Sequence, residues 1–159
     1  MKITIYAVGR VSEPYLAEGI REYRKRLAPY ATLAVTEVRD ERIGLGAGTS
    51  EGQTALTREG ERLRAALAQG AYIVATTPRG EALSSEELAR MLDRLSREGR
   101  PHLGFLIGGT LGLAEDLLRD ADFRLSLSRL TFPHQLARLI LMEQLYRSYK
   151  ILRGEPYHR

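Results

Sequence analysis

Hydrophobic residues follow two different spacings along the chain, and each spacing predicts a different kind of element. Residues 3–8 form a nearly continuous apolar run, which is typical of a strand that is covered on both faces. After Ser12 and Pro14, apolar side chains recur every three or four residues as far as Leu27, with charged residues between them. This second pattern predicts an amphipathic helix that has Ser12 as its N-cap and ends near Pro29.

Strand and helix patterns continue to alternate along the rest of the sequence. Ser84 and Glu87 have the spacing of a capping box, which predicts the start of one of the helices. Further strands are predicted at residues 32–38, 71–77, 102–107 and 123–127, and further helices at residues 53–68, after Ser84, at 114–120 and at 135–152. The order favours an α/β fold with a mostly parallel sheet of five to six strands and helices on both faces. We expect a single domain over residues 1–159.

Loops at the carboxyl ends of the strands are the candidate ligand loops, because ligands bind at this edge of parallel sheets. These loops follow Thr77, Ile107 and Leu127. The second loop begins with Gly108, and glycine lets the backbone approach a flat ligand closely. An ordinary tight turn is the alternative interpretation. Gly44 and the glycines after it resemble a dinucleotide fingerprint, but they follow a charged stretch instead of a strand, so we reject a cofactor loop there.

Polar side chains after the last strand allow two interpretations. Ser126, Ser128 and Thr131 have hydroxyls that could bind a ligand, although capping of the next helix is the simpler interpretation. His134, at the start of that helix, is either a packed side chain or a base, and the packed alternative is favoured. The helix at 135–152 has an apolar stripe that is wider than one core contact requires, which predicts partial burial by a second subunit.

Composition excludes several kinds of chemistry. The chain is 43% hydrophobic and 28% charged, which is typical of a globular protein. The apolar run in its first eight residues is too short and too interrupted by polar groups for a signal peptide, so we expect a cytoplasmic protein. No cysteine is present, which excludes disulfides, thiolate metal sites and cysteine nucleophiles. The three histidines lack ligand spacing, so we expect no metal. A net charge of +4 suits a polyanionic partner, although solvated helix faces also account for it.

Four motifs together resemble the bacterial ribosomal RNA large subunit methyltransferase H family, which belongs to the SPOUT superfamily of knotted methyltransferases. The similarity extends to the first strand, so it spans essentially the whole chain. The motifs are Phe105-Leu106-Ile107-Gly108-Gly109-x-x-Gly112, the stretch from Leu125 to Gln135 with Thr131-Phe132-Pro133-His134, Glu143-Gln144-x-Tyr146-Arg147, and Gly154-x-Pro156-Tyr157-His158. The resemblance implies a C-terminal trefoil knot and a homodimer. It also implies S-adenosyl-L-methionine as cofactor and N3 of a pseudouridine in 23S rRNA of the assembled ribosome as substrate.

The resemblance also implies site residues. Thr76 stands where many members of the family have leucine. The cofactor-binding residues would be Thr76, Gly108, Leu127, Ser128, Arg129, Leu130, Thr131 and Phe132. In the tail, we expect Tyr157 to orient the RNA base and His158 to accept the N3 proton, with bulk water as the alternative acceptor. RNA phosphates would be contacted by Arg10, Arg153 and Arg159.

Two other functions stay open at this point. A noncatalytic protein that binds RNA or associates with the ribosome would keep the fold but not the cofactor. An enzyme of the same fold that methylates a tRNA or a ribose hydroxyl is less supported, because the Tyr157-His158 ending matches the rRNA family.

Overall fold

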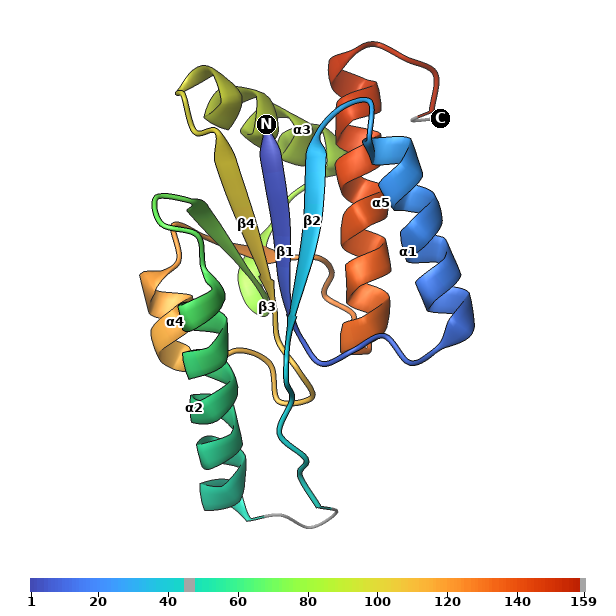
Figure 1. Ribbon diagram of the computed structural model, residues 1–159. Helices are drawn as coiled ribbons and strands as arrows, with labels where there is room; N and C mark the ends of the chain where they lie inside the picture. The colour runs from blue at the N-terminus through green and yellow to red at the C-terminus, as the bar shows by residue number, and fades with distance from the viewer. Residues whose placement is uncertain (45–47, 158–159) are drawn as a thin grey trace.

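Five parallel strands form one sheet in the computed structural model, which describes residues 1–44 and 48–157. The strand order is β2-β1-β4-β3-β5 (Figure 1). The strands are β1 (Lys2–Val8), β2 (Thr32–Val38), β3 (Tyr72–Ala82), β4 (His102–Ile107) and β5 (Phe123–Ser126), and the helices are α1 (Pro14–Leu27), α2 (Thr49–Ala66), α3 (Ser85–Arg97), α4 (Glu115–Asp120) and α5 (His134–Leu152). This arrangement confirms the predicted parallel α/β sheet. The trefoil knot stays a prediction.

The sheet has a hydrophobic core on each of its faces, which confirms that helices cover both. Helices α1, α3 and α5 pack on one face, and α2 and α4 pack on the other (Figure 1). The central strand β1 contributes to both cores, with Ile3 and Ile5 in the first and Tyr6 and Val8 in the second. All four side chains are at most 2% exposed, as the continuous apolar run predicted.

The third strand is longer than the sequence predicted. We expected residues 78–80 to close it, because Pro-Arg-Gly is a turn signal, but β3 continues to Ala82 and pairs again with β5. Its register shifts between Thr76 and Glu81, so the residues between them bulge out of the ladder. A Cβ on Gly80 would lie 2.6 Å from the carbonyl carbon of Leu125, so glycine is what allows the β5 backbone to pass here.

Two predicted helix starts are wrong. Helix α2 begins at Thr49, four residues before the predicted Gln53, because the N–H groups of Glu51 and Gly52 already donate hydrogen bonds to the Gly48 carbonyl. The N-cap of α1 is Glu13, and Ser12 does not cap the helix. Both the backbone and the side chain of Ser12 bond instead to the Gln135 side chain of α5. A tertiary contact therefore replaces the local cap.

The start of α3 has the predicted capping box. Ser84 Oγ accepts a hydrogen bond from the Glu87 backbone N–H at 3.1 Å, and a Glu87 carboxylate oxygen accepts one from the Ser84 N–H at 2.7 Å. Two of the unpaired N–H groups at the helix start are thereby satisfied. Within residues 1–44 and 48–157, no helix combines the length and apolar character that a membrane span requires.

Ser84→Ala removes the acceptor of this capping box. We expect the free energy of unfolding to fall by about 1 kcal/mol, since the loss of a serine cap has this typical cost. The matched control is Ser96→Ala, an exposed serine in the last turns of the same helix, which should change stability by less than about 0.5 kcal/mol. Equal denaturation midpoints for Ser84→Ala and the unmodified protein would show that the capping box contributes nothing.

Candidate functional site

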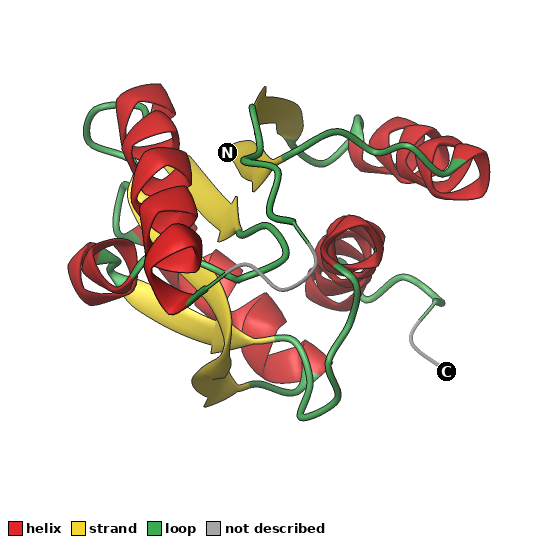
Figure 2. Ribbon diagram, turned by 90° about the horizontal axis from the view of Figure 1, so that it is seen from below, coloured by secondary structure: helices red, strands yellow, loops and turns green. Residues whose placement is uncertain are grey.

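A cavity of about 380 Å³ lies at the carboxyl edge of the sheet, where β3, β4 and β5 end. Its size is within the range of small-molecule sites. Figure 2 views the molecule from this edge and shows the connecting loops gathered between the helices. The lining residues are 76–79, 107–113, Leu118, 127–128, 130–132, His134 and Ala137. The loops that were predicted to bind a ligand, because they follow the carboxyl ends of the strands, therefore line one cavity together with the first turn of α5.

The turn after β4 is held so tightly that its first residue must be glycine. A Cβ on Gly108 would lie 2.3 Å from the carbonyl carbon and oxygen of Gly112. The Gly112 N–H donates to the Gly109 carbonyl at 3.0 Å, and Gly112 has a φ of +81°, a conformation that favours glycine. The segment is the tight turn of the alternative interpretation, and its residues also line the cavity, whereas close approach to a ligand stays a prediction.

Thr76 lies at the cavity wall where β3 begins to bulge. Its hydroxyl donates to the Leu106 carbonyl at 2.7 Å, so this group links β3 to β4. Because the hydroxyl is bonded to Leu106, only the methyl group of Thr76 can make an apolar contact with a molecule in the cavity. A leucine there would offer a larger apolar surface and no such hydrogen bond.

The loop from Leu127 to Phe132 keeps its shape through local hydroxyl bonds. Ser126 Oγ donates to the Ser128 carbonyl at 3.0 Å, and Ser128 Oγ accepts from the Leu130 N–H at 2.9 Å. These two hydroxyls shape the loop, and the N-cap of α5 is Pro133, without a side-chain cap. Leu127, Ser128, Leu130, Thr131 and Phe132 line the cavity, whereas Arg129 is exposed and is not among the lining residues.

His134 lines the cavity from the first turn of α5. Burial lowers the pKa of its imidazole, the positive charge of Arg138 lowers it further, and Asp40 opposes them. The imidazole is therefore neutral at pH 7, because its pKa lies below the usual value of about 6.5. A neutral imidazole can donate or accept a hydrogen bond in the cavity and adds no charge to it.

The rest of the cavity lining is apolar side chain, hydroxyl and backbone. Arg79 is the one other ionisable lining residue, and it is paired with Glu115 at the exposed rim. No group of three or more His, Cys, Asp or Glu in the part of the chain that the structure describes is placed to hold a metal ion. The cavity is therefore suited to hold a ligand by shape and backbone hydrogen bonds, and none of the described residues that line it has a carboxylate for acid–base chemistry.

Tyr157 lies at the opposite end of α5 from the cavity. Its hydroxyl is 3.2 Å from both the Tyr23 hydroxyl and a Glu143 carboxylate oxygen, and its ring packs on Tyr146 with centroids 4.8 Å apart. Burial and these neighbours raise the pKa of Tyr157 far above that of a free phenol. Glu143 lies nine residues, or about 14 Å of helix axis, beyond His134, and Tyr157 is not among the residues that line the cavity of its own chain.

The predicted RNA-contacting residues are also separated within one chain. Arg10 is exposed in the connection between β1 and α1, at the carboxyl edge. Arg153 is exposed at the other end of α5, where its guanidinium carbon lies 4.4 Å from the ring centroid of Tyr30. His158 and Arg159 lie outside the described residues.

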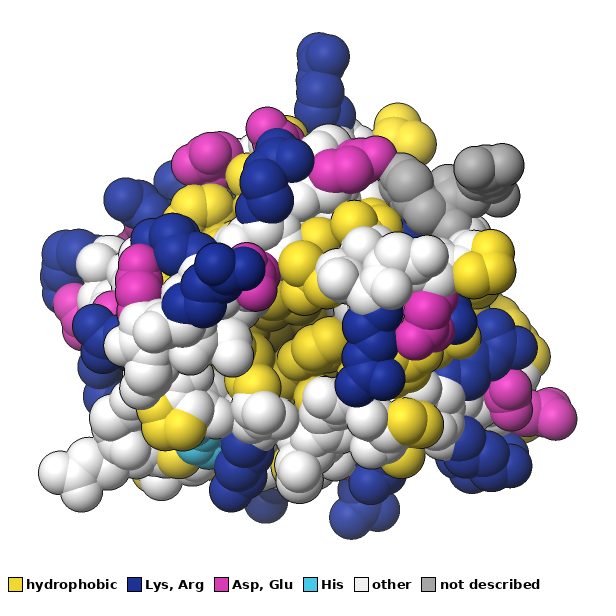
Figure 3. Space-filling model, turned by 90° about the horizontal axis from the view of Figure 1, so that it is seen from above, with side chains coloured by type: hydrophobic (Ala, Val, Ile, Leu, Met, Phe, Trp, Pro, Cys, Tyr) yellow, Lys and Arg dark blue, Asp and Glu magenta, His cyan; other side chains and the backbone are white. Residues whose placement is uncertain are grey.

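The amino edge of the sheet carries a second cavity of about 340 Å³. Met1, Lys2, Thr32, Ser96, Gly99, Arg100 and Pro101 line it. Figure 3 views the molecule from this edge and shows a hollow with hydrophobic side chains, with Lys and Arg side chains distributed around it. None of the predicted site residues lies there, and ligands of parallel sheets bind at the opposite edge.

Known proteins share both the sequence and the fold of this chain. A family model described as a predicted SPOUT methyltransferase matches residues 1–158. Proteins named ribosomal RNA large subunit methyltransferase H are 53% identical in Acetivibrio thermocellus and 50% identical in Carboxydothermus hydrogenoformans, each over 159 residues and the full length of both chains. The chain belongs to this family of SPOUT methyltransferases. The resemblance inferred from the motifs is confirmed, and so is the expectation of a methyl-transferring enzyme.

A solved structure supports the fold alone. It is a probable methylase family protein from Haemophilus influenzae, with a TM-score of 0.51 at 10% identity. The match covers 96% of this chain and 66% of that longer protein. The two proteins therefore share the fold at a low level of sequence identity.

Sequence reasoning missed two buried charged side chains behind the cavity of this SPOUT methyltransferase. Arg138 is 1% exposed and Glu59 is 6% exposed. Glu59 accepts a hydrogen bond from the Glu41 N–H at 3.0 Å and lies against Gly109, and burial raises the pKa of its carboxyl. Of these two residues, only Arg138 could have been found from the sequence, because it interrupts the apolar stripe of α5 between Ala137 and the core residue Leu141.

Gly108→Ala adds a methyl group where the Gly112 backbone lies 2.3 Å away. Backbone cannot move aside as a flexible side chain does, so we expect the free energy of unfolding to fall by about 3 kcal/mol. Gly44→Ala is the matched control, since its new methyl group would meet no atom within 4 Å. Denaturant unfolding of both variants provides the comparison. Equal stability of the two would mean that the 108–112 turn opens freely.

Proposed function

We propose that this chain binds S-adenosyl-L-methionine in the carboxyl-edge cavity and methylates N3 of a pseudouridine in 23S rRNA on the assembled ribosome, as a homodimer. The glycine turn at 108–112, which brings bare backbone into the cavity beside the 127–132 loop, is the observation that carries the proposal. The names of relatives that match the full length of the chain support the RNA substrate class.

The cavity fits the proposed cofactor in size and in chemistry. Its volume of about 380 Å³ suits a molecule of this class. Backbone groups exposed by the glycine turn provide donors and acceptors for the edge of a purine, and Leu127, Leu130 and Phe132 provide apolar contacts. Among the described lining residues, His134 has a neutral imidazole and the one cationic side chain is Arg79, which is paired with Glu115.

The proposed reaction requires little covalent work from the protein. S-adenosyl-L-methionine supplies a methyl group on a sulfonium that is already activated for transfer. The residues of the chain hold the acceptor base in line with that group and exclude competing water, and such positioning contributes several kcal/mol. When the new N–C bond forms, the N3 proton leaves, and we propose that His158 accepts it while Tyr157 orients the base; solvent water is the alternative acceptor.

The distance along α5 supports a site that two subunits share. Within one chain, Tyr157 packs against α5 at Glu143, about 14 Å along the helix axis from His134, and it does not line the cavity. Leu111 and Leu130 are 45% and 73% exposed, and both line the cavity. We propose that the tail of a second subunit covers these side chains and completes the site.

Arginines on separate parts of the chain would then contact one RNA. Arg10 lies near the cavity of one subunit, and Arg153 and Arg159 belong to the tail of the other. Each neutralised phosphate adds affinity that falls as salt rises. RNA binding that is insensitive to salt would contradict these three assignments.

Methyl transfer to ribosomes from a strain without the gene tests the proposed function. We expect the purified protein and labelled S-adenosyl-L-methionine to modify one pseudouridine, and mass spectrometry of 23S rRNA to place the methyl group on N3. Calorimetry that detects no cofactor binding would instead favour the noncatalytic RNA-binding alternative. A methylated tRNA or ribose hydroxyl would contradict the substrate assignment.

Mixing two inactive variants tests the shared site. Gly108→Ala disables the cavity and His158→Ala disables the tail, so each homodimer should be inactive. If each site combines the cavity of one subunit with the tail of the other, subunit exchange in an equal mixture should restore roughly a quarter of the sites. A mixture that remains inactive after exchange, or full activity of His158→Ala alone, would contradict the tail assignment.

Protonation of His134 should weaken cofactor binding, because it places a positive charge near a sulfonium. Because the pKa of His134 is lowered below the usual value of about 6.5, its imidazole is neutral at and above that pH. Affinity should therefore be constant from neutral to basic pH and decrease only at acidic pH below that value. His134→Gln should flatten this profile when it is measured by calorimetry. The same loss at low pH in His134→Gln would assign it to another group.

A further inference from the structure

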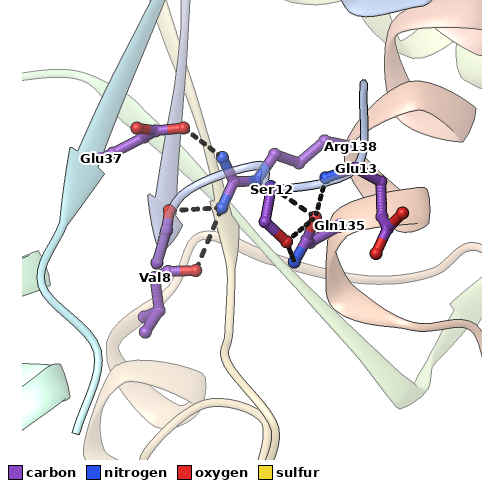
Figure 4. Close-up of polar contacts among 7 residues, drawn as sticks. Val8, Ser12, Glu13, Glu37, Gln135 and Arg138 are labelled. Atoms are coloured by element: carbon purple, nitrogen blue, oxygen red, sulfur yellow. Dashed lines mark hydrogen bonds and ion pairs between the residues drawn. The ribbon is translucent and has the colours of Figure 1, made fainter. Parts of the chain in front are cut away.

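Arg138 is a buried arginine that joins α5 to the carboxyl ends of β1 and β2. One of its terminal nitrogens donates to a Glu37 carboxylate oxygen at 2.6 Å. The other donates to the carbonyls of Val8 and Gly9 at 3.0 and 2.6 Å (Figure 4). The side chain is 1% exposed, and its Nε has no hydrogen-bond partner within the described residues. Burial of a guanidinium is costly, and here two carbonyls and a carboxylate offset that cost.

Gln135 forms a second link between the same segments. Its side-chain oxygen accepts from the Ser12 N–H at 2.9 Å, and its side-chain nitrogen donates to Ser12 Oγ at 3.1 Å (Figure 4). The N-cap residue of α5, Pro133, provides no side-chain cap. The first two turns of α5 are therefore fixed by long-range bonds to the β1–α1 connection. We call Arg138, Glu37 and Gln135, with the groups they bind, the α5 clamp.

The α5 clamp touches the cavity wall on two sides without entering the cavity. Val8, whose carbonyl Arg138 binds, packs against Gly109 of the glycine turn, with a Val8 methyl 3.1 Å from the position of a Cβ there. The corresponding position on Gly9 lies 3.9 Å from His134 Nε2. Arg138 therefore holds together the glycine turn and the start of α5, which ends the 127–132 loop.

We infer that Arg138 is a positioning residue for the cofactor: by clamping the start of α5 to β1 and β2, it sets the distance between the glycine turn and the 127–132 loop. This inference rests on the proposed function. The guanidinium is not among the cavity-lining residues, so its effect is on the shape of the wall. Loss of the α5 clamp should therefore weaken binding of the cofactor and leave the chemical step of the bound complex largely unchanged.

Arg138→Met, which keeps the apolar stem and removes all three bonds, is the main test. We expect the Kd and the KM for S-adenosyl-L-methionine to rise about tenfold or more, the KM for ribosomes to stay unchanged and kcat at saturating cofactor to stay within about threefold. Arg138→Lys should be intermediate, because an ammonium cannot reach all three acceptors as a planar fork does.

Two controls separate positioning from general destabilisation. Leu27→Ala opens a cavity in the core at the far end of α1 and should lower the melting temperature without changing the cofactor Kd. Arg97→Met removes an exposed arginine that is paired with Asp93, and it should change neither the melting temperature nor the cofactor Kd. If Arg138→Met is folded and binds the cofactor as tightly as the unmodified protein, the inference is wrong. The inference is equally wrong if Leu27→Ala has the same melting temperature as Arg138→Met and loses as much affinity for the cofactor.

Milder variants decide the matter if Arg138→Met does not fold. Glu37→Gln keeps an acceptor but removes its charge, and Gln135→Ala removes the second link. Each should raise the cofactor Kd about threefold, and unchanged affinity in both would overturn the inference. Absence of cofactor binding by the unmodified protein would instead refute the proposed function, so the two failures are distinguishable.

Discussion

Close approach of backbone to backbone at the carboxyl edge of the sheet is the constraint on which the rest of the structure depends. The Gly112 carbonyl lies 2.3 Å from where a Gly108 Cβ would be, and the Leu125 backbone lies 2.6 Å from the same position on Gly80. Only glycine permits either contact. Because of them, three loops from neighbouring parallel strands come together around one cavity. The main chain of the glycine turn therefore forms part of the cavity wall, beside apolar and hydroxyl side chains.

Helix α5 has a different role at each end. Its first turns form part of the cavity wall and are held by Arg138 and Gln135, whereas its last turn holds the tail. There the Tyr30 hydroxyl donates to Glu155 at 2.6 Å and Tyr157 packs on Tyr146. In the proposed homodimer, the tail of the second subunit would reach each cavity.

Local signals in the sequence predicted most of the fold. Periodicity placed all ten elements, and the Ser84–Glu87 spacing identified a cap that forms as expected. The general preference of ligands for the carboxyl edge of parallel sheets predicted the loops that line the cavity. Two of the errors are caused by tertiary contacts: pairing with β5 extends β3 beyond Pro78, and Gln135 binds Ser12, which does not cap α1. Arg138 was missed because its carbonyl partners lie about 130 positions away, a relation that no local pattern contains.

A crystal structure of the protein with S-adenosyl-L-methionine tests the central claim most directly. We predict that the cofactor lies in the carboxyl-edge cavity, in contact with Thr76, the 108–112 turn and the 127–132 loop, and with a tail from the second subunit over it. Cofactor bound in the amino-edge cavity beside Lys2 and Gly99, or bound at the carboxyl edge without contact to the glycine turn, would contradict the account.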